Sequence, residues 1–144
     1  MTRAAIATKA KRVLVVDDDA DQRLALVSFL SNIGVTVRQA ASAAEARAAF
    51  RSFEPNVIIS DIAMPGEDGF DLITALRRLP GGSPKHLFAV AITGVGDKQT
   101  PGRAFAAGFD RLLSKPLNLT ALVRAVLEDR KAADHRAGGD NPEG

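Results

Sequence analysis

The sequence contains no cysteine and only two histidines, and these absences limit the chemistry open to it. Without cysteine there is no disulfide framework, no thiolate metal site and no cysteine nucleophile, and two isolated histidines provide no cluster for zinc. No stretch approaches the roughly 18 apolar residues of a membrane span, and residues 1–12 lack the apolar run of a signal peptide. We therefore expect a cytoplasmic protein with no membrane contact, rather than a secreted, disulfide-stapled one.

What the chain does contain is the profile of an ordinary globular domain. Its 144 residues are 46% hydrophobic and 25% charged, which suits one domain with a sizeable core. The formal net charge of +2 is local, because residues 1–12 carry four basic side chains and no acidic one, whereas the remainder is close to neutral. A near-neutral body gives no electrostatic reason to expect direct DNA binding.

Short apolar runs alternate with helical patterns along the chain. The runs predict strands at 13–16, 35–40, 57–60, 87–92 and 111–113, each followed by a helix, of which the fourth lies near 104–107. Strict alternation of buried strands and helices predicts an α/β fold, a doubly wound five-stranded parallel sheet with five helices. We expect residues 11–131 to form this domain, residues 1–10 to be a flexible basic leader, and residues 132–144 to be a disordered tail.

Cap residues predict where several helices begin and end. Asp19 is typical of an N-cap after the first strand, and Ser42 with Glu45 has the spacing of a capping box ahead of the second helix. Gly34 stands where the first helix needs its C-terminal cap, and Pro55 stops the second helix.

Polar residues gather at the carboxyl ends of the predicted strands, where open α/β sheets bind ligands. They are Asp17, Asp18 and Asp19 after the first strand, Asp61 after the third, Thr93 after the fourth and Lys115 after the fifth. Crowded carboxylates would raise one another's pKa values and weaken the fold unless a cation offsets their charge. Mg²⁺, which prefers oxygen ligands and keeps several waters, fits a pocket of Asp17, Asp18 and Asp61.

This pocket predicts phosphoryl chemistry. With the metal present, the Asp61 carboxylate could attack phosphorus as a nucleophile and form an acyl phosphate. The Lys115 ammonium would pair with one phosphoryl oxygen, and the Thr93 hydroxyl would donate a hydrogen bond to another.

Four motifs carry a resemblance to a known family: VLVVDDD at 13–19, VIISDIAMPGEDGF at 57–70, AITG at 91–94 and AGFDRLLSKPL at 107–117. Over about residues 11–130 the sequence resembles the receiver domains of response regulators in two-component, His-Asp phosphorelay systems. The resemblance implies a flavodoxin-like fold with strand order 2-1-3-4-5. It also implies a cis peptide bond between Lys115 and Pro116.

The resemblance assigns a role to each site residue. Asp17, Asp18, Asp61 and the backbone carbonyl of Ala63 would hold Mg²⁺. Asp61 would be the phosphoacceptor for a sensor histidine kinase or a histidine phosphotransfer protein, Thr93 the switch hydroxyl and Lys115 the phosphate-binding lysine. Such a protein is no enzyme beyond catalysing its own phosphorylation and dephosphorylation.

The resemblance also implies a downstream protein partner that reads the fourth helix, the fifth strand and the fifth helix, and it allows a homodimer. Two positions depart from the family pattern. Leu112 stands where an aromatic residue is usual, so we expect a different packing change in the switch. Ala63 stands where a polar residue is frequent, so the lifetime of the acyl phosphate does not carry over.

Other readings of the acidic motif fit less well. An EF-hand loop starting at Asp17 would need glycine at Gln22 and glutamate at Ser28. A haloacid-dehalogenase-like phosphatase with Asp17 as nucleophile would need a hydroxyl residue at Asp21. A nucleotide binder of the same architecture would need a glycine-rich loop after the first strand.

Within the family, three modes remain open. We expect a single-domain receiver that signals through protein contacts, because few residues follow the last predicted helix. The alternatives are a receiver fragment of a hybrid histidine kinase or larger regulator, and a phosphate-independent interaction module. The last would bind its partner equally well after Asp61→Asn.

Overall fold

Five parallel strands form the centre of the molecule. The computed structural model describes residues 11–80, 87–94 and 100–127, so the predicted leader at 1–10 and tail at 132–144 lie outside the described residues. The strands are β1 (Arg12–Val16), β2 (Thr36–Ala40), β3 (Val57–Asp61), β4 (Phe88–Thr93) and β5 (Arg111–Ser114). They lie in the order β2-β1-β3-β4-β5, which confirms the predicted topology.

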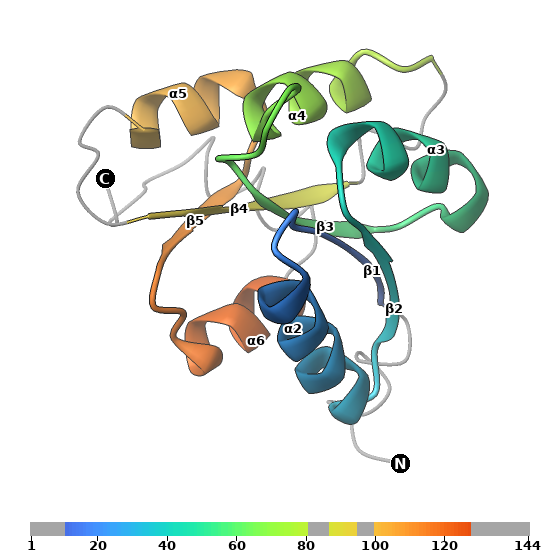
Figure 1. Cartoon of the computed structure of the whole chain (residues 1–144), viewed down its shortest axis with the longest axis vertical. Coiled ribbons are helices and arrows are strands. Elements are labelled where there is room, and N and C mark those ends of the chain that lie inside the picture. Colours follow the sequence, from blue (N-terminus) through green and yellow to red (C-terminus); the bar gives the residue numbers. More distant parts are fainter. Residues whose placement is uncertain (1–10, 81–86, 95–99, 128–144) are drawn as a thin grey trace.

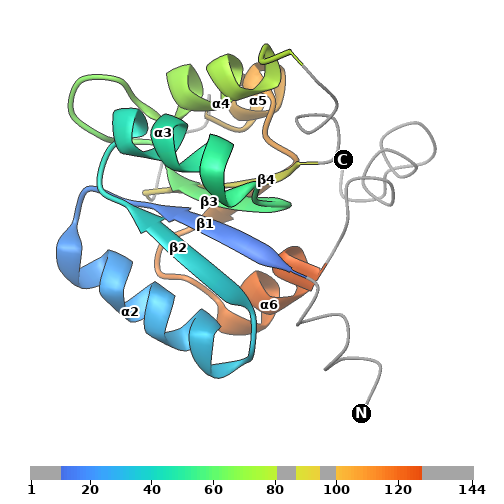
Figure 2. The ribbon, with the colours of Figure 1, turned by 90° about the vertical axis from the view of Figure 1, so that its right-hand side faces the viewer.

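The helices cover both faces of this sheet. They are α2 (Ala20–Asn32), α3 (Ala43–Phe53), α4 (Gly69–Arg77), α5 (Thr100–Ala107) and α6 (Leu119–Leu127). Helices α3, α4 and α5 lie on one face, and α2 and α6 lie on the other (Figures 1 and 2). The predicted doubly wound fold is therefore confirmed, and none of the described helices is long and apolar enough to cross a membrane.

Side-chain alternation along the strands builds one hydrophobic core on each face. In β1, Val13 and Val15 pack in the cluster under α2 and α6, whereas Leu14 and Val16 pack in the cluster under α3, α4 and α5. All four are at most 1% exposed. A strand covered on both faces must be apolar at every position, which explains the continuous run VLVV.

A Schellman motif ends α2 and corrects one predicted boundary. Gly34 has φ 98, the Gly34 N–H donates to the Ser31 carbonyl at 3.1 Å, and the Val35 N–H donates to the Leu30 carbonyl at 3.4 Å. Because the Val35 N–H closes the helix, the second strand begins at Thr36 rather than at Val35.

Two other caps and one helix start refine the predicted boundaries. Ser42 Oγ accepts from the Glu45 N–H as expected, but the Glu45 carboxylate accepts from the Ala41 N–H, one residue outside the predicted box. A full capping box, which the sequence analysis did not predict, joins Asp68 and Asp71 at the start of α4. Helix α5 begins at Thr100, earlier than expected, because a proline is tolerated in the first turn.

Candidate functional site

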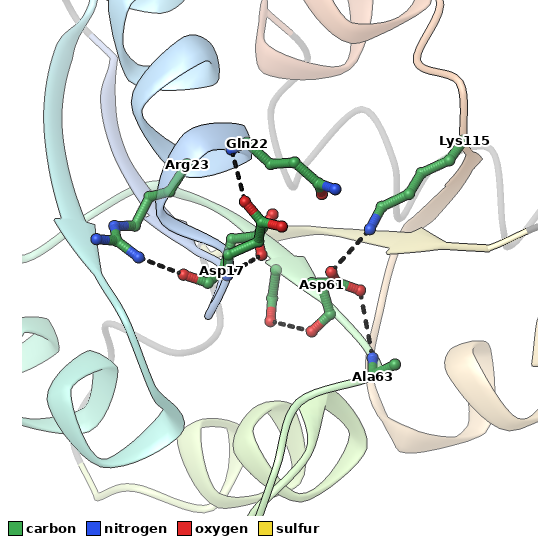
Figure 3. A network of polar contacts seen from close by, with 8 residues as sticks. Asp17, Gln22, Arg23, Asp61, Ala63 and Lys115 are labelled. Atoms are coloured by element: carbon green, nitrogen blue, oxygen red, sulfur yellow. Dashed lines mark hydrogen bonds and ion pairs between the residues drawn. The ribbon is translucent and has the colours of Figure 1, made fainter.

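The polar residues predicted at the strand ends lie together at one edge of the sheet. Asp17 directly follows β1, Asp61 is the last residue of β3, Thr93 is the last residue of β4, and Lys115 directly follows β5. Because β1 and β3 are paired in parallel, with Val16 opposite Ser60, Asp17 and Asp61 emerge side by side (Figure 3).

Three carboxylates form the acidic part of the site. One oxygen of each of Asp17, Asp18 and Asp61 lies within 4.8 Å of the others. Asp17 and Asp61 are buried, each 6% exposed, whereas Asp18 is exposed. This donor set fits a small hard cation such as Mg²⁺, because it offers three carboxylate oxygens and the exposure of Asp18 gives solvent access from which water ligands could come.

Local backbone geometry separates the roles of the neighbouring aspartates. Asp17 Oδ1 accepts from the Asp19 N–H at 2.9 Å, and Asp19 Oδ1 accepts from the Gln22 N–H at 3.0 Å (Figure 3). Asp19 is therefore the N-cap of α2, as the sequence predicted. Arg23 from the first turns of α2 donates to the Asp17 carbonyl at 2.8 Å and thereby fixes the backbone of the acidic residue.

Both oxygens of the Asp61 carboxylate have a partner. Lys115 Nζ lies 3.0 Å from Oδ2, and the Ala63 N–H donates to Oδ1 at 3.3 Å (Figure 3). Ala63 is thus beside Asp61, and the predicted metal contact of its carbonyl stays a prediction. The peptide bond between Lys115 and Pro116 is cis, as expected from the resemblance.

The charges of the site shift two pKa values. Burial raises the pKa of Asp17, and the negative charges of Asp61 and Asp18 raise it further against the opposing effects of the Asp19 N–H and Lys115. For Lys115, partial burial lowers the pKa, but the hydrogen bond and charge of Asp61 outweigh it, so the net shift is upward. Lys115 is therefore a cation at neutral pH, available to an anionic group.

Thr93 and Lys115 come from adjacent strands. The Lys115 N–H donates to the Thr93 carbonyl at 2.9 Å, which continues the pairing of β4 with β5. Thr93 is half-buried and Gly94 is exposed, and a Cβ built on Gly94 would meet no atom of the described residues within 4 Å. Among the described residues, none covers the edge of the site at Gly94.

Gly69 allows the start of α4 to lie close to the backbone of Asp61. The sequence analysis did not identify this glycine. A Cβ at this position would lie 2.7 Å from the Asp61 carbonyl oxygen and 2.8 Å from Ile62 Cα. The Gly69 N–H also donates to the Ile62 carbonyl at 2.9 Å. The second glycine of the motif MPGEDG, Gly69, is thus required by a close approach of α4 to the backbone of Asp61.

An apolar cleft of about 370 Å³ opens beside Asp17 and Lys115. Its other walls come from α2, the end of β4, the segment after β5 and the start of α6. They are Gln22, Ala25, Leu26, Phe29, Ile92, Pro116, Leu117 and Leu119. No local sequence pattern predicts this cleft, because its walls come from segments that are far apart in the chain.

The fold and the acidic edge are those of a response regulator receiver domain. Residues 13–127 match the family model described as the response regulator receiver domain, and the chain belongs to this family. The strand order, the helix placement and the two-component assignment predicted from the sequence are therefore confirmed.

Relatives of this chain differ in length. It is 39% identical over 114 residues to an uncharacterized 14.6 kDa protein from the sodA1 3′ region of Leptolyngbya boryana, covering 79% of this chain and 86% of that protein. It is 34% identical to the C4-dicarboxylate transport transcriptional regulatory protein DctD of Rhizobium meliloti, covering 88% of this chain and 26% of the relative. A crystal structure of a response regulator receiver protein from Pseudomonas putida matches with a TM-score of 0.73 and 31% identity, covering 81% of this chain and 94% of that one.

Proposed function

We propose that this chain is a phosphoacceptor that takes a phosphoryl group onto Asp61 from a sensor histidine kinase or a histidine phosphotransfer protein. The observation that carries the proposal is the Asp61 carboxylate, which is buried beside Asp17 and Asp18 and paired with Lys115. Asp17, Asp18, Asp61 and the Ala63 carbonyl would hold Mg²⁺, which would supply charge neutralisation at the phosphoryl group.

The transfer exchanges one bond for another. A carboxylate oxygen of Asp61 forms a bond to phosphorus, the bond from phosphorus to the donor imidazole nitrogen breaks, and that nitrogen keeps the electron pair. The Asp61 oxygen now bound to phosphorus carries less charge, so Lys115 exchanges its carboxylate partner for a phosphoryl oxygen. The chain has no enzymatic role beyond its own phosphorylation and dephosphorylation.

The apolar cleft offers a surface on which a phosphodonor protein would dock. It lies against Asp17 and Lys115 and is walled by Phe29 of α2 and Leu119 of α6, of which Leu119 is 51% exposed. A protein that presents an apolar surface around its phosphorylated histidine would bury these side chains while it delivers the phosphoryl group. The cytoplasm is the compartment in which we place this exchange.

Switching would begin at Thr93. Donation of its hydroxyl to a phosphoryl oxygen would draw the end of β4 toward Asp61 and shift the face formed by α5, β5 and α6, which a downstream protein reads. Leu112, in place of the usual aromatic residue, is half-buried and already packs on the core under α3, α4 and α5. The response of this face would therefore use aliphatic repacking.

A receiver within a longer protein is a second candidate. The chain spans about a quarter of the length of its relative DctD, whose printed description is a transcriptional regulatory protein. In that arrangement the same Asp61 chemistry would control a linked domain instead of a separate partner. The two candidates share the site and differ only in what reads the α5, β5 and α6 face.

Intact mass measurement tests the phosphoacceptor assignment. The protein is incubated with Mg²⁺ and a small phosphodonor such as acetyl phosphate, and we expect one phosphoryl adduct on the parent and on Asp21→Asn. Asp21 is a matched control because it is an exposed aspartate in the first turn of α2. No adduct on the parent, or an undiminished adduct on Asp61→Ala, would refute the proposal.

A further inference from the structure

A partly buried arginine joins four segments at the opposite end of β4 and β5 from the acidic site. Arg77 is the last residue of α4, and its side chain is 17% exposed. Its Nε and Nη2 donate to the Gly108 carbonyl at 3.0 and 2.7 Å, and its Nη1 donates to the Leu87 carbonyl at 2.7 Å. Nη2 also pairs with Asp110 Oδ2 at 2.9 Å.

Asp110 connects this guanidinium to the sheet. Its side chain is 6% exposed, and Oδ2 accepts from the Ala89 N–H at 2.8 Å. Its own N–H donates to the Ala89 carbonyl at 2.7 Å. Asp110 therefore extends the pairing of β4 with β5 by one residue before Arg111, and Arg77 holds it there.

Gly108 packs closely against the Arg77 side chain. It has φ 129, a conformation that favours glycine, and a Cβ built on it would lie 3.0 Å from Arg77 Cγ and 3.3 Å from Nε. The backbone at the end of α5 thus passes directly against the arginine stem. Removing the guanidinium would leave the carboxylate of Asp110, whose side chain is only 6% exposed, without this positive partner, which makes the contact costly to break.

The position of these contacts relates them to switching. Ala89 is near the start of β4 and Thr93 is at its end, while Gly108 follows directly on α5. We propose that Arg77 is a positioning residue of the switch, a clamp that fixes the C-terminal end of α5 and the start of β5. A displacement that begins at Thr93 then turns α5 about Gly108, instead of detaching it from α4. This inference rests on the proposed phosphorylation of Asp61.

Hydrogen exchange tests the clamp in the unphosphorylated protein first. Arg77→Met keeps the apolar stem and removes every donor, and Arg78→Met is the matched control because Arg78 is the next residue and is exposed. We expect exchange of amides in residues 104–112 to rise at least about tenfold in Arg77→Met and to stay at the parent rate in Arg78→Met. Parental exchange in Arg77→Met would overturn the clamp.

The second measurement adds Mg²⁺ and an excess of acetyl phosphate. We expect Arg77→Met to gain the phosphoryl adduct to the parental extent, within about twofold, but to lose the phosphorylation-dependent change in exchange over 100–107 that the parent shows. A change as large as the parental one would refute the role in switching. If Arg77→Met does not fold, as judged by circular dichroism, Arg77→Lys, which keeps the charge but not the forked donors, makes the same comparison.

The two proposals fail differently. A parent without an adduct refutes the phosphoacceptor function, and the role of Arg77 in switching falls with it. A parent that is phosphorylated and shows the exchange change, beside an Arg77→Met variant that behaves identically, refutes the clamp and leaves the function standing.

Discussion

Replacing Asp17 by asparagine should stabilise the protein in the absence of Mg²⁺. The substitution keeps the shape of the side chain and the oxygen that accepts from the Asp19 N–H, but it removes one of three crowded negative charges. At the 4.8 Å limit of their separation, two unit charges repel by about 1 kcal/mol in a water-like medium and about 3.5 kcal/mol at the effective dielectric constant of a protein surface. Because Lys115 offsets part of this repulsion, we expect a gain near the lower value.

The pH dependence follows from the direction of the pKa shift. Burial and the charge of Asp61 raise the pKa of Asp17 above its ordinary 3.8, so the folded state holds this proton more tightly than the unfolded state. The cost of the charged form is therefore absent below pH 3.8, grows as the pH rises from 3.8 through the folded pKa, and is complete above the folded pKa. The advantage of Asp17→Asn should shrink and vanish as the pH is lowered through this window.

Urea unfolding at pH 7 with EDTA and with Mg²⁺ measures the effect. In EDTA we expect Asp17→Asn to unfold at a higher urea concentration than the parent. When Mg²⁺ replaces EDTA, we expect the urea midpoint of the parent to rise more than that of Asp17→Asn, because a ligand stabilises the state that binds it. Asp21→Asn, at an exposed position on α2, should change little. A destabilised Asp17→Asn in EDTA, or an equal gain from Mg²⁺, would contradict the electrostatic reasoning.

Two further substitutions probe the neighbours of Asp61. Lys115→Met removes the ammonium 3.0 Å from Asp61 Oδ2 but leaves the three carboxylates in place. We therefore expect the phosphoryl adduct to form at least about tenfold more slowly, while Mg²⁺ still raises the free energy of unfolding. Loss of the Mg²⁺ effect would contradict this separation of roles. Gly69→Ala places a Cβ 2.7 Å from the Asp61 carbonyl and should cost about 1 to 3 kcal/mol in urea unfolding. Gly102→Ala, whose Cβ meets no atom of the described residues within 4 Å, should instead stabilise α5 by up to about 1 kcal/mol, and equal effects of the two would refute the steric argument.

Local patterns explain how much of the fold could be predicted from the sequence. The run at 13–16 is apolar at every position because β1 is covered on both faces, and this pattern needs no knowledge of the partner strands. The carboxyl ends of parallel strands lie at one edge, so Asp17, Asp61 and Lys115 could be grouped before any contact was known. The boundary at Thr36 could not, because it depends on which carbonyl the Val35 N–H reaches.

No local sequence pattern predicted the contacts of Arg77. The guanidinium donates to the backbone carbonyls of Leu87 and Gly108, 10 and 31 residues away, and a carbonyl is present at every position whatever its side chain. The apolar cleft was missed for the same reason, because its walls come from α2, β4, the segment after β5 and the start of α6. Both features exist only after the sheet order has brought these segments together.

The acidic cluster is the place where local electrostatics conflicts with the fold. Asp17 and Asp61 accept hydrogen bonds, as Asp19 does on the first turn of α2. Their charges are nevertheless buried beside each other, and Lys115 supplies one positive charge against three negative ones. Conflicts of this kind concentrate at functional sites, because a sequence selected for stability alone would remove them. The stability that Asp17→Asn should restore is therefore the cost of keeping an edge on this sheet that, in the proposed function, would bind a cation and accept a phosphoryl group.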